Sequence, residues 1–368
     1  MVSLSRRWAT RLLFPSLFVA AAPALAAQEA TLKGAAAARG LLFGAAPETD
    51  LATAPEAYRR LLAAECGLLA PVLPWTAARL PGDYRFGDAA TAAIAFARAS
   101  QMRLTGSHLL WHEWTPDWFR ALPPGPEAQR AARRHIVAMA TRFGGEVYAW
   151  NVVNEALMPD DGRADGLRAT ALLDKLGPDF IAAAFAAARP CDPRALLLYN
   201  DYNLEAATRH HAAKRDGLAR LLDRLQRAGA PIDGVGLQSH LDAGDPFDER
   251  QYRGFLRDIA SRGLKIVITE LDARDTKTAG TIAARDQAIA DLYARFLAVA
   301  LDERAVTAVV VWGLADPYSW QNEASRREFR RADGLPARPL PYDDAFRPKP
   351  AYRAILRALE NAPRREPG

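Results

Sequence analysis

Short apolar runs rich in β-branched residues alternate with longer helix-like stretches along most of this chain of 368 residues. The apolar runs occupy residues 40–44, 67–72, 103–110, 147–153, 195–200, 234–239, 265–269 and 306–312. Stretches rich in Ala, Leu, Arg and Glu occupy residues 88–100, 127–142, 172–188, 206–228, 251–262, 283–301 and 350–358. This alternation predicts βα units built around a parallel sheet.

The eight apolar runs are almost continuously hydrophobic, which is typical of strands buried on both faces of a sheet. Their number and the chain length predict an α/β fold, a (β/α)8 TIM barrel forming a single domain. The alternative is an open doubly wound sheet, which usually carries a glycine-rich phosphate turn after its first strand. The stretch LLFGAAPETD at 41–50 contains one glycine and no such turn, so the barrel is favoured.

Residues 1–26 are predicted to be a secretory signal peptide. A basic start with Arg6, Arg7 and Arg11 precedes an apolar segment and the cleavage sequence Ala24-Leu25-Ala26. Ser5-Arg6-Arg7 weakly resembles a twin-arginine export signal, and a general secretory signal is the equal alternative. We therefore expect the mature domain to comprise residues 27–368, to be secreted or periplasmic, and to have no membrane attachment after cleavage.

Charge and cysteine content give no indication of a charged partner, a disulfide scaffold or a zinc site. Cleavage after Ala26 removes three arginines and no acidic residue, so the formal charge falls from +5 to +2. This small excess gives no reason to expect nucleic acid or acidic lipid as a partner. Cys66 and Cys191 are too few for a disulfide scaffold and do not have zinc-ligand spacing. We expect a monomer that needs no metal and no organic cofactor.

Polar and aromatic residues gather where the predicted strands end, which in a barrel is the site of catalysis. Glu155 ends the fourth run, and Glu270 ends the seventh. Two glutamates that face each other push their pKa values apart, giving one acid and one base near neutral pH. Glycoside hydrolysis needs such a pair, and tryptophan faces bind sugar rings. The other strand-end residues are Trp111, His112, Asn200, Asp201, Tyr202, Asn203, Gln238, Ser239, His240 and Trp312.

Each of these residues taken alone has a structural interpretation. A single strand-end glutamate is more often an ion-pair partner, and a strand-end tryptophan is usually part of the core. The stretch TRHHAAKRD at 208–216 is interpreted as a solvated helix face. No HExxH motif or Ser-His-Asp arrangement supports a metalloprotease or a serine hydrolase. The functional interpretation therefore depends on the joint pattern.

Five motifs carry a family resemblance when they are taken in order. They are WNVVNEA (150–156), LLYNDYN (197–203), GVGLQSHL (234–241), ITELD (268–272) and VVVWGLADPYSW (309–320). Together they resemble the strand-end motifs of the family 10 glycoside hydrolases, the retaining endo-β-1,4-xylanases. The resemblance extends over residues 40–355, nearly the whole predicted mature chain.

The resemblance implies a role for each matching residue. Glu155 matches the general acid/base of the family, and Glu270 matches its nucleophile. Asn154 matches the asparagine that hydrogen-bonds the sugar 2-hydroxyl, a contact that strengthens in the transition state. His240 matches the histidine that lies between the nucleophile and an aspartate. The other matching positions are Asp272 as that aspartate, Gln238 beside the nucleophile, and Trp111, Tyr202, Trp312 and Trp320 as substrate-binding walls.

The implied activity is cleavage of internal β-1,4-xylosidic bonds of xylan by double displacement, with the two carboxyl groups about 5–5.5 Å apart. One alternative is a retaining β-glycosidase that acts on another β-linked glycan or glycoconjugate. Another is a barrel that binds carbohydrate with little activity. Retention of both glutamates argues against this last alternative, because binding alone requires neither carboxylate.

The chain departs from the family pattern at three places on the glycone side. The family's PENEMKW-type segment is here APVLPW (70–75), without the Glu-Asn pair and with Pro74 in place of lysine. Ser107 replaces the first histidine of GHTLVWH, and His108 follows it, on a strand position expected to face away from the site. Asn151 replaces an aspartate. We expect weaker or altered glycone binding, and a neutral Ser107–Asn151 pair in place of a His–Asp interaction.

Overall fold

A computed structural model describes residues 30–80, 82 and 87–366. The predicted signal peptide lies outside these residues. Among them, no helix is both long and apolar enough to cross a membrane.

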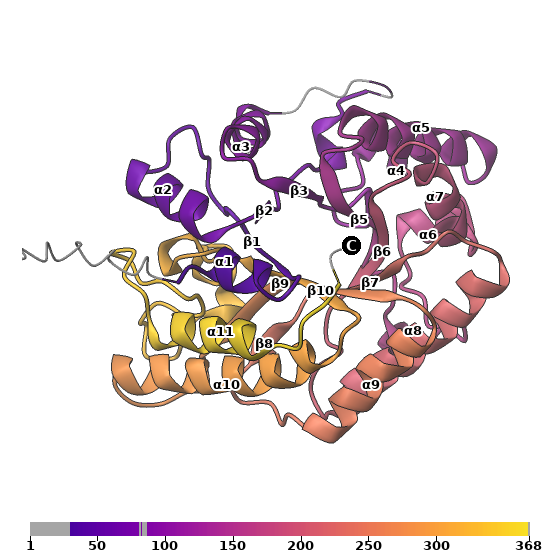
Figure 1. Ribbon diagram of the computed structural model, residues 1–368. Helices are drawn as coiled ribbons and strands as arrows, with labels where there is room; N and C mark the ends of the chain where they lie inside the picture. Colours follow the sequence, from indigo (N-terminus) through magenta and orange to yellow (C-terminus); the bar gives the residue numbers. More distant parts are fainter. Residues whose placement is uncertain (1–29, 81, 83–86, 367–368) are drawn as a thin grey trace, which may run out of the picture.

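Eight parallel strands form a closed barrel surrounded by helices (Figure 1). Neighbouring strands pair in chain order, and the last strand pairs with both the first and the seventh, which closes the sheet. Two short strands, β4 (Leu110–Trp111) and β8 (His240–Asp242), pair with β5 and β9 beyond the barrel strands. The predicted TIM barrel is therefore confirmed. The barrel strands are β1 (Leu42–Ala46), β2 (Leu68–Leu69), β3 (Arg103–Gly106), β5 (Val147–Asn154), β6 (Leu196–Asp201), β7 (Gly234–Leu237), β9 (Lys265–Arg274) and β10 (Val306–Trp312).

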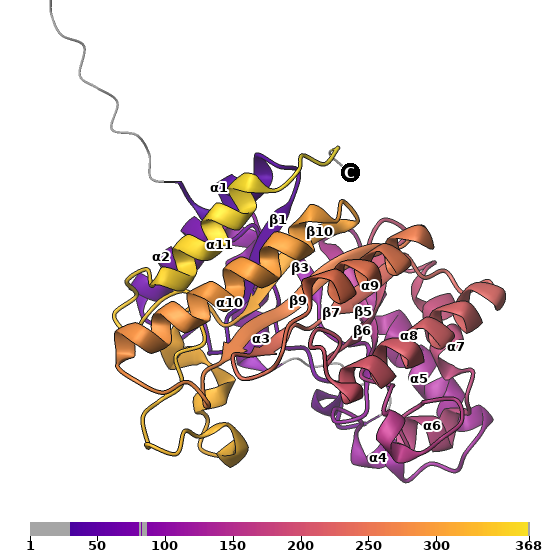
Figure 2. The same ribbon diagram turned by 90° about the horizontal axis from the view of Figure 1, so that it is seen from below.

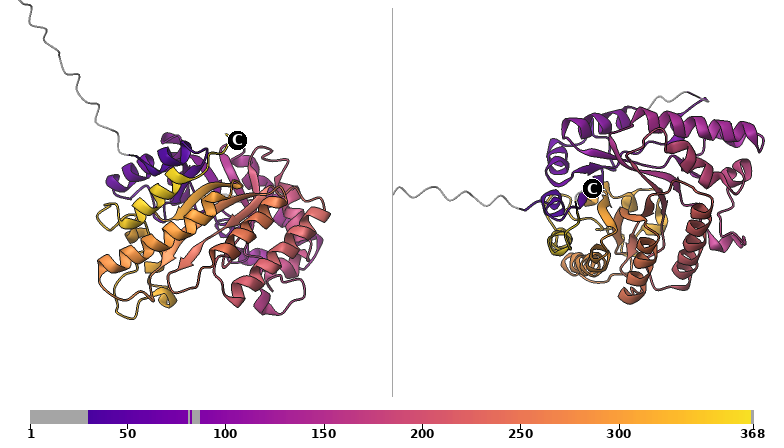
Figure 3. Two further views of the ribbon diagram at one scale, coloured as in Figure 1. Left: turned by 60° about the horizontal axis from the view of Figure 1, so that its bottom comes forward. Right: turned by 45° about the vertical axis from the view of Figure 1, so that its right-hand side comes forward.

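The helices lie on the outside of the barrel, as the two views of Figure 3 show. The first and last helices lie together (Figure 2), and Tyr352 Oη donates to the carbonyl of Ala30 at 2.9 Å. This contact brings the two ends of the described chain to the same side. The helices are α1 (Leu32–Ala37), α2 (Glu56–Glu65), α3 (Asp88–Ala99), α4 (Asp117–Arg120), α5 (Pro126–Arg142), α6 (Ala171–Leu176), α7 (Phe180–Ala188), α8 (Arg209–Arg227), α9 (Glu249–Ser261), α10 (Ile282–Asp302) and α11 (Pro350–Asn361).

Helix α8 illustrates how local sequence sets an element. Thr208 precedes it, and its hydroxyl accepts from the backbone N–H of His211 at 3.2 Å, a cap that stabilises a helix by about 1 kcal/mol. Leucines at three- and four-residue spacing then form one apolar face, which is buried on the barrel. These are Leu218, Leu221, Leu222 and Leu225.

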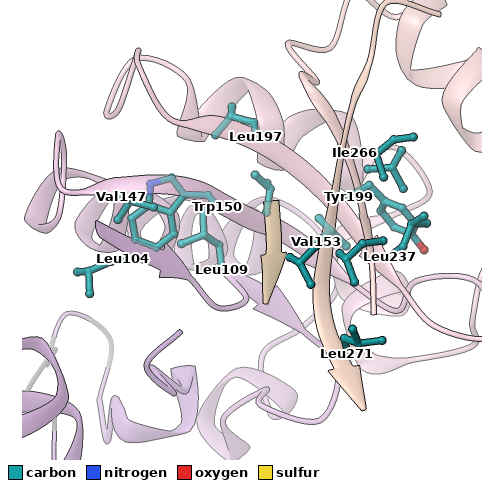
Figure 4. Packing of buried hydrophobic residues seen from close by; sticks show 14 of the residues in the cluster. Leu104, Leu109, Val147, Trp150, Val153, Leu197, Tyr199, Leu237, Ile266 and Leu271 are labelled. Carbon is teal, nitrogen blue, oxygen red and sulfur yellow. The ribbon is translucent and has the colours of Figure 1, made fainter. Parts of the chain in front are cut away.

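The two faces of each strand are buried in different cores, which explains why the strand sequences are continuously apolar. In β10, Val309 and Val311 belong to the large cluster that also contains helix residues, whereas Ala308 and Val310 belong to a small cluster of strand residues. The large cluster fills the layer between strands and helices, part of which Figure 4 shows. The small cluster fills the barrel interior.

Two predicted elements are interrupted in the structure. The run at 103–110 is divided into β3 and β4 because His108 has a left-handed backbone, with φ of 28°. The helical stretch at 172–188 is divided into α6 and α7 at Gly177, whose φ of 82° ends α6, and Pro178, which has no N–H to donate. Helices α1, α2 and α4 had not been predicted.

Replacing Gly106 with alanine is expected to destabilise the protein by about 1–3 kcal/mol or more. A Cβ at Gly106 would lie 2.0 Å from Cε3 of Trp150, which is fully buried and is anchored by a hydrogen bond from Nε1 to Asp192. Urea unfolding measures the change. The matched control is Gly254→Ala in α9, where no atom lies within 4 Å of the new Cβ and alanine is the better helix former. Equal stability of both variants would contradict the packing argument.

Candidate active site

Backbone strain is concentrated at the carboxyl ends of the strands. Seven non-glycine residues among those described have positive φ. Five of them lie just after the carboxyl end of a barrel strand. Non-glycine residues with positive φ are uncommon, and they gather at functional sites, where surrounding contacts stabilise the strained backbone. The five are Glu48, His108, Glu155, Asn203 and Ser239.

Glu155 lies directly after β5, and its φ of 56° turns the side chain into the site. Its Oε2 accepts from Trp111 Nε1 at 2.9 Å, and its Oε1 accepts from Gln238 Nε2 at 2.9 Å. Burial raises the pKa of Glu155 to about 7, with the Asp201 and Glu270 charges adding to the rise and both hydrogen bonds opposing it. The carboxyl group can therefore both give and take a proton near neutral pH.

Glu270 is buried within β9, and both of its carboxylate oxygens have donors. Oε1 accepts from Asn200 Nδ2 at 2.9 Å, and Oε2 lies 3.2 Å from His240 Nε2. His240 Nδ1 lies 2.9 Å from Asp272 Oδ1. Burial disfavours a charged His240, but Asp272 and Glu270 outweigh it and raise the pKa of His240 well above its usual value. The imidazolium thus donates to both carboxylates and fixes the orientation of Glu270.

An amide network connects the two glutamates. Asn154 Oδ1 accepts from Asn200 Nδ2 at 2.8 Å and from Gln238 Nε2 at 3.2 Å. Since Asn200 also donates to Glu270 and Gln238 to Glu155, Asn154 lies between the two carboxylates. Thr269 Oγ1 donates to Asn200 Oδ1 at 2.7 Å and sets the orientation of that amide. In the sequence, Asn200 was recognisable only as a strand-end residue, and Thr269 carried no signal of its own.

The predicted aromatic residues lie around this centre. Trp111 contacts Glu155 as described above. Trp320 Nε1 donates to Asp272 Oδ2 at 2.5 Å, and its ring centroid lies 5.3 Å from that of His240. Trp312 ends β10 beside Ala46 of β1. All three indoles are partly exposed, so each retains surface for a ligand.

Tyr202 is held by two cations. Arg168 donates through Nη2 to Tyr202 Oη at 2.8 Å and through Nε to the backbone carbonyl of Glu155 at 2.8 Å. Lys214 Nζ lies 3.8 Å from the centre of the Tyr202 ring and pairs with Asp201 at 2.5 Å. Lys214 is fully buried, so the interpretation of 208–216 as a solvated face is wrong. Arg168 lies in a loop and had no strand-end signal.

The Ser107–Asn151 hypothesis is only half supported. Both side chains line one small cavity in the barrel interior together with Trp312, so they share a face. The Ser107 hydroxyl, however, donates to the backbone carbonyl of Pro71 at 2.5 Å. The hydroxyl thus provides a hydrogen-bond donor for a backbone carbonyl of the altered 70–75 segment, and it does not pair with Asn151.

The expectation that His108 faces away from the site is wrong. His108 is buried, and its Nε2 lies 3.4 Å from Asn154 Nδ2. The left-handed backbone at this residue breaks the in–out alternation of the strand and turns the imidazole toward the site.

Glu48 is a third carboxyl group at this end of the barrel, in the loop after β1, and it was not among the predicted site residues. Burial raises the pKa of Glu48 to about 8, and the nearby charges of Glu270, Glu323 and Asp272 add to the rise. Its only signal was an acidic residue two positions beyond a strand. Among the described residues, no group of three or more His, Cys, Asp or Glu side chains is arranged to hold a metal ion.

Comparisons with known proteins agree with this geometry. The sequence profile of the family described as "Glycosyl hydrolase family 10" matches residues 31–358. Endo-1,4-beta-xylanase B of Thermotoga neapolitana is 32% identical over 271 residues, covering 73% of this chain and 72% of that protein. Native xylanase 10B of Thermotoga maritima superposes with a TM-score of 0.80 at 29% identity, covering 90% of this chain and 98% of that one. Xylanase 10B of Thermotoga petrophila RKU-1, in complex with xylobiose, has a TM-score of 0.80 at 28% identity, with the same coverage of both chains.

Proposed function

Because the chain belongs to glycosyl hydrolase family 10, we propose that it is a retaining endo-1,4-β-xylanase that cleaves internal bonds of xylan. The observation that carries the proposal is the pair of strand-end glutamates in different environments. Glu155 has a pKa raised to about 7, whereas Glu270 faces a charged His240. An acid and a nucleophile on opposite sides of one sugar are the requirement of this reaction.

In the first step, Glu155 gives its proton to the glycosidic oxygen while a Glu270 oxygen attacks the anomeric carbon. The bond to the leaving sugar breaks, and a covalent glycosyl-enzyme ester forms on Glu270. Trp111 and Gln238 donate to Glu155 and hold the carboxylate that remains after proton transfer. His240 and Asn200 keep Glu270 pointing at the carbon.

In the second step, ionised Glu155 takes a proton from a water molecule, and that water attacks the anomeric carbon. The ester bond breaks, Glu270 is released, and the sugar leaves with its original configuration. Asn154 donates to the sugar 2-hydroxyl, a contact expected to strengthen in the transition state. Trp111, Tyr202, Trp312 and Trp320 provide the faces and edges that bind the xylan chain.

A second candidate substrate is another β-linked glycan or glycoconjugate, because the glycone side differs from the family pattern. Pro74 replaces a lysine, and Ser107 uses its hydroxyl on Pro71 rather than on a ligand. Glu48, whose pKa is raised to about 8 by burial, lies in the loop after the adjacent strand β1. A site that lacks the donors of the Glu-Asn pair and of the lysine is expected to bind a plain xylose unit less tightly.

We also propose that the protein acts outside the cytoplasm as a monomer. The basic and apolar segment at 1–26 with its Ala24-Leu25-Ala26 sequence supports export, and xylan is an extracellular polymer too large to enter a cell. N-terminal sequencing of the secreted protein tests the cleavage after Ala26, and sedimentation tests the monomer.

Purified protein is expected to cleave xylohexaose internally, to release the β-anomer first, and to act faster on it than on cellohexaose. Loss of one hydrogen bond to a charged group costs about 1.5–3 kcal/mol, so kcat/KM on xylohexaose should lie about 10- to 150-fold below that of a relative that retains the Glu-Asn and lysine residues. Product chromatography and proton NMR of the fresh anomer measure both outcomes. Faster cleavage of cellohexaose favours the second candidate, and release of the α-anomer contradicts the retaining mechanism.

A further inference from the structure

His108 occupies a closely defined position next to Asn154. Its side chain is buried, and Nε2 lies 3.4 Å from Asn154 Nδ2. The imidazole centroid lies 5.1 Å from that of Trp111 and 5.0 Å from that of Trp114, so two indoles hold the ring in place. The backbone reaches this position through a φ of 28°, which is uncommon for a residue with a side chain.

The orientation of the Asn154 amide follows from the groups around it. The Glu270 carboxylate can only accept, so the Asn200 atom beside it is Nδ2, a donor. That same Nδ2 lies 2.8 Å from Asn154, whose facing atom must therefore be the accepting Oδ1. Asn154 Nδ2 is then the atom that faces His108, and it donates.

The tautomer of His108 follows from this donor. Nε2 accepts from Asn154, so the ring proton lies on Nδ1, and the imidazole is neutral. A proton on Nε2 would instead place two N–H groups against each other. Burial lowers the pKa of His108 to about 4, which agrees with a neutral ring. Nδ1 is buried and has no hydrogen-bond partner among the described residues, so the contact with Asn154 is the one polar anchor of this ring within that part of the chain.

We infer that His108 is a positioning residue, which accepts from one N–H of the Asn154 amide and thereby directs the other N–H toward the sugar 2-hydroxyl. The inference rests on the proposed glycosidase function. Three acceptor–donor contacts then determine the amide completely: Asn200 and Gln238 on Oδ1, and His108 on Nδ2. Without His108, the amide can still tilt about the Oδ1 contacts, and the free N–H loses its alignment.

This arrangement is specific to the local sequence GSHLLWH at 106–112. Ser107 donates to the Pro71 carbonyl and is not available to the amide. The imidazole belongs to His108, one residue later than the first histidine of the family motif. The left-handed backbone at His108 turns its side chain toward the site despite this shift of one residue. The strained backbone at His108 and the altered 70–75 segment are thus connected through Ser107, which lies next to His108 and donates to Pro71.

The test uses two aryl β-xylobiosides, one normal and one lacking the 2-hydroxyl on the xylose that carries the aryl group. His108→Ala should lower kcat on the normal substrate about 100-fold, the size of effect expected from misplacing a contact, with KM nearly unchanged. On the 2-deoxy substrate the loss should be less than about threefold, because the aligned contact no longer exists. His108→Gln, which can place an acceptor near the position of Nε2, should restore most of kcat.

Equal losses on both substrates, or no loss on either, would overturn the inference. Asn154→Ala is the companion variant, and its effect should not add to that of His108→Ala. Ser107→Ala is the matched neighbour and should leave the ratio between the two substrates unchanged. Thermal unfolding of each variant separates loss of fold from loss of alignment.

A readout independent of activity is the nitrogen NMR spectrum of His108 in the wild-type protein. We expect a neutral ring with its proton on Nδ1 at every pH from about 5 to 8. A proton on Nε2, or a charged ring in this range, contradicts the inference. Failure of the wild type to cleave either xylobioside would instead contradict the proposed function, and the NMR result would still decide the arrangement of His108.

Discussion

Glu270→Ala is expected to lower kcat on xylan by at least about 10⁴-fold, the scale seen when a covalent nucleophile is removed from a catalytic unit. Among the described residues, Glu270 is the carboxylate that contacts both Asn200 Nδ2 and His240 Nε2, whereas Asp272 lies on the other ring nitrogen of His240. Without the Glu270 side chain, we therefore expect no ester intermediate to form. KM should change little, because the aromatic binding faces remain. Hydrolysis of xylohexaose, followed by chromatography, measures the loss.

Small anions should partly rescue this variant. Azide can enter the space left by the side chain and attack the anomeric carbon directly, so the product is the α-glycosyl azide, with inverted configuration. Glu360→Ala, an exposed position on α11, is the matched control and should retain full activity. Retained activity of Glu270→Ala without azide would rule out the double displacement.

The variant Glu155→Ala should lose about 10²- to 10⁴-fold in kcat on xylan, the usual contribution of general acid–base catalysis. The loss should depend on the leaving group. Xylan leaves as a strongly basic alkoxide that needs a proton, whereas an aryl group with an acidic phenol does not. On such an aryl xylobioside the first step should therefore remain fast and the ester should accumulate, because no base activates water. A burst of released phenol, followed by slow turnover, is the measurement.

The pH profile provides a second test of Glu155. Its pKa is raised to about 7, and the first step needs the protonated form. On the alkaline side of the pH profile, activity should therefore be high below pH 7 and fall as the pH rises through about 7. In Glu155→Ala this alkaline limb should disappear. A profile that keeps its limb in the variant would assign the titration to another group.

Glu48→Gln is the control for that assignment, because the pKa of Glu48 is raised to about 8 and this carboxyl is influenced by the Glu270 charge. The alkaline limb near pH 7 should persist in Glu48→Gln. If it is lost there and persists in Glu155→Ala, then Glu48 and not Glu155 controls the alkaline side.

The fold could be predicted from the sequence because the burial of each strand on both faces is visible in its own apolar residues. In β10, the run at 306–312 is apolar at every position, since one face meets the helices and the other fills the barrel. The predicted and observed bounds of this strand agree. The bounds agree less well where a turn, rather than burial, ends the element, as at Gly177 between α6 and α7.

The site could be predicted to the extent that its residues stand at strand ends. Glu155, Glu270, Gln238 and His240 all lie near the carboxyl end of a strand, and the barrel brings them together. Arg168 and Glu48 lie in loops, and a loop residue approaches a site only through the path of its backbone. Lys214 lies near the start of α8, in a stretch of mainly polar residues, and its burial depends on its pairing with Asp201.

The sequence by itself determined the barrel, its rim and the two carboxylates, because strand periodicity and strand ends are local properties that a closed parallel sheet converts directly into position. Only the tertiary structure decided how the rim is arranged. His108 has a left-handed backbone, and its imidazole lies beside Asn154 and not on the far face of the strand. Burial together with the Asp201 and Glu270 charges moves the pKa of Glu155 to about 7. Both effects depend on neighbours distant in the chain, and no local pattern records them.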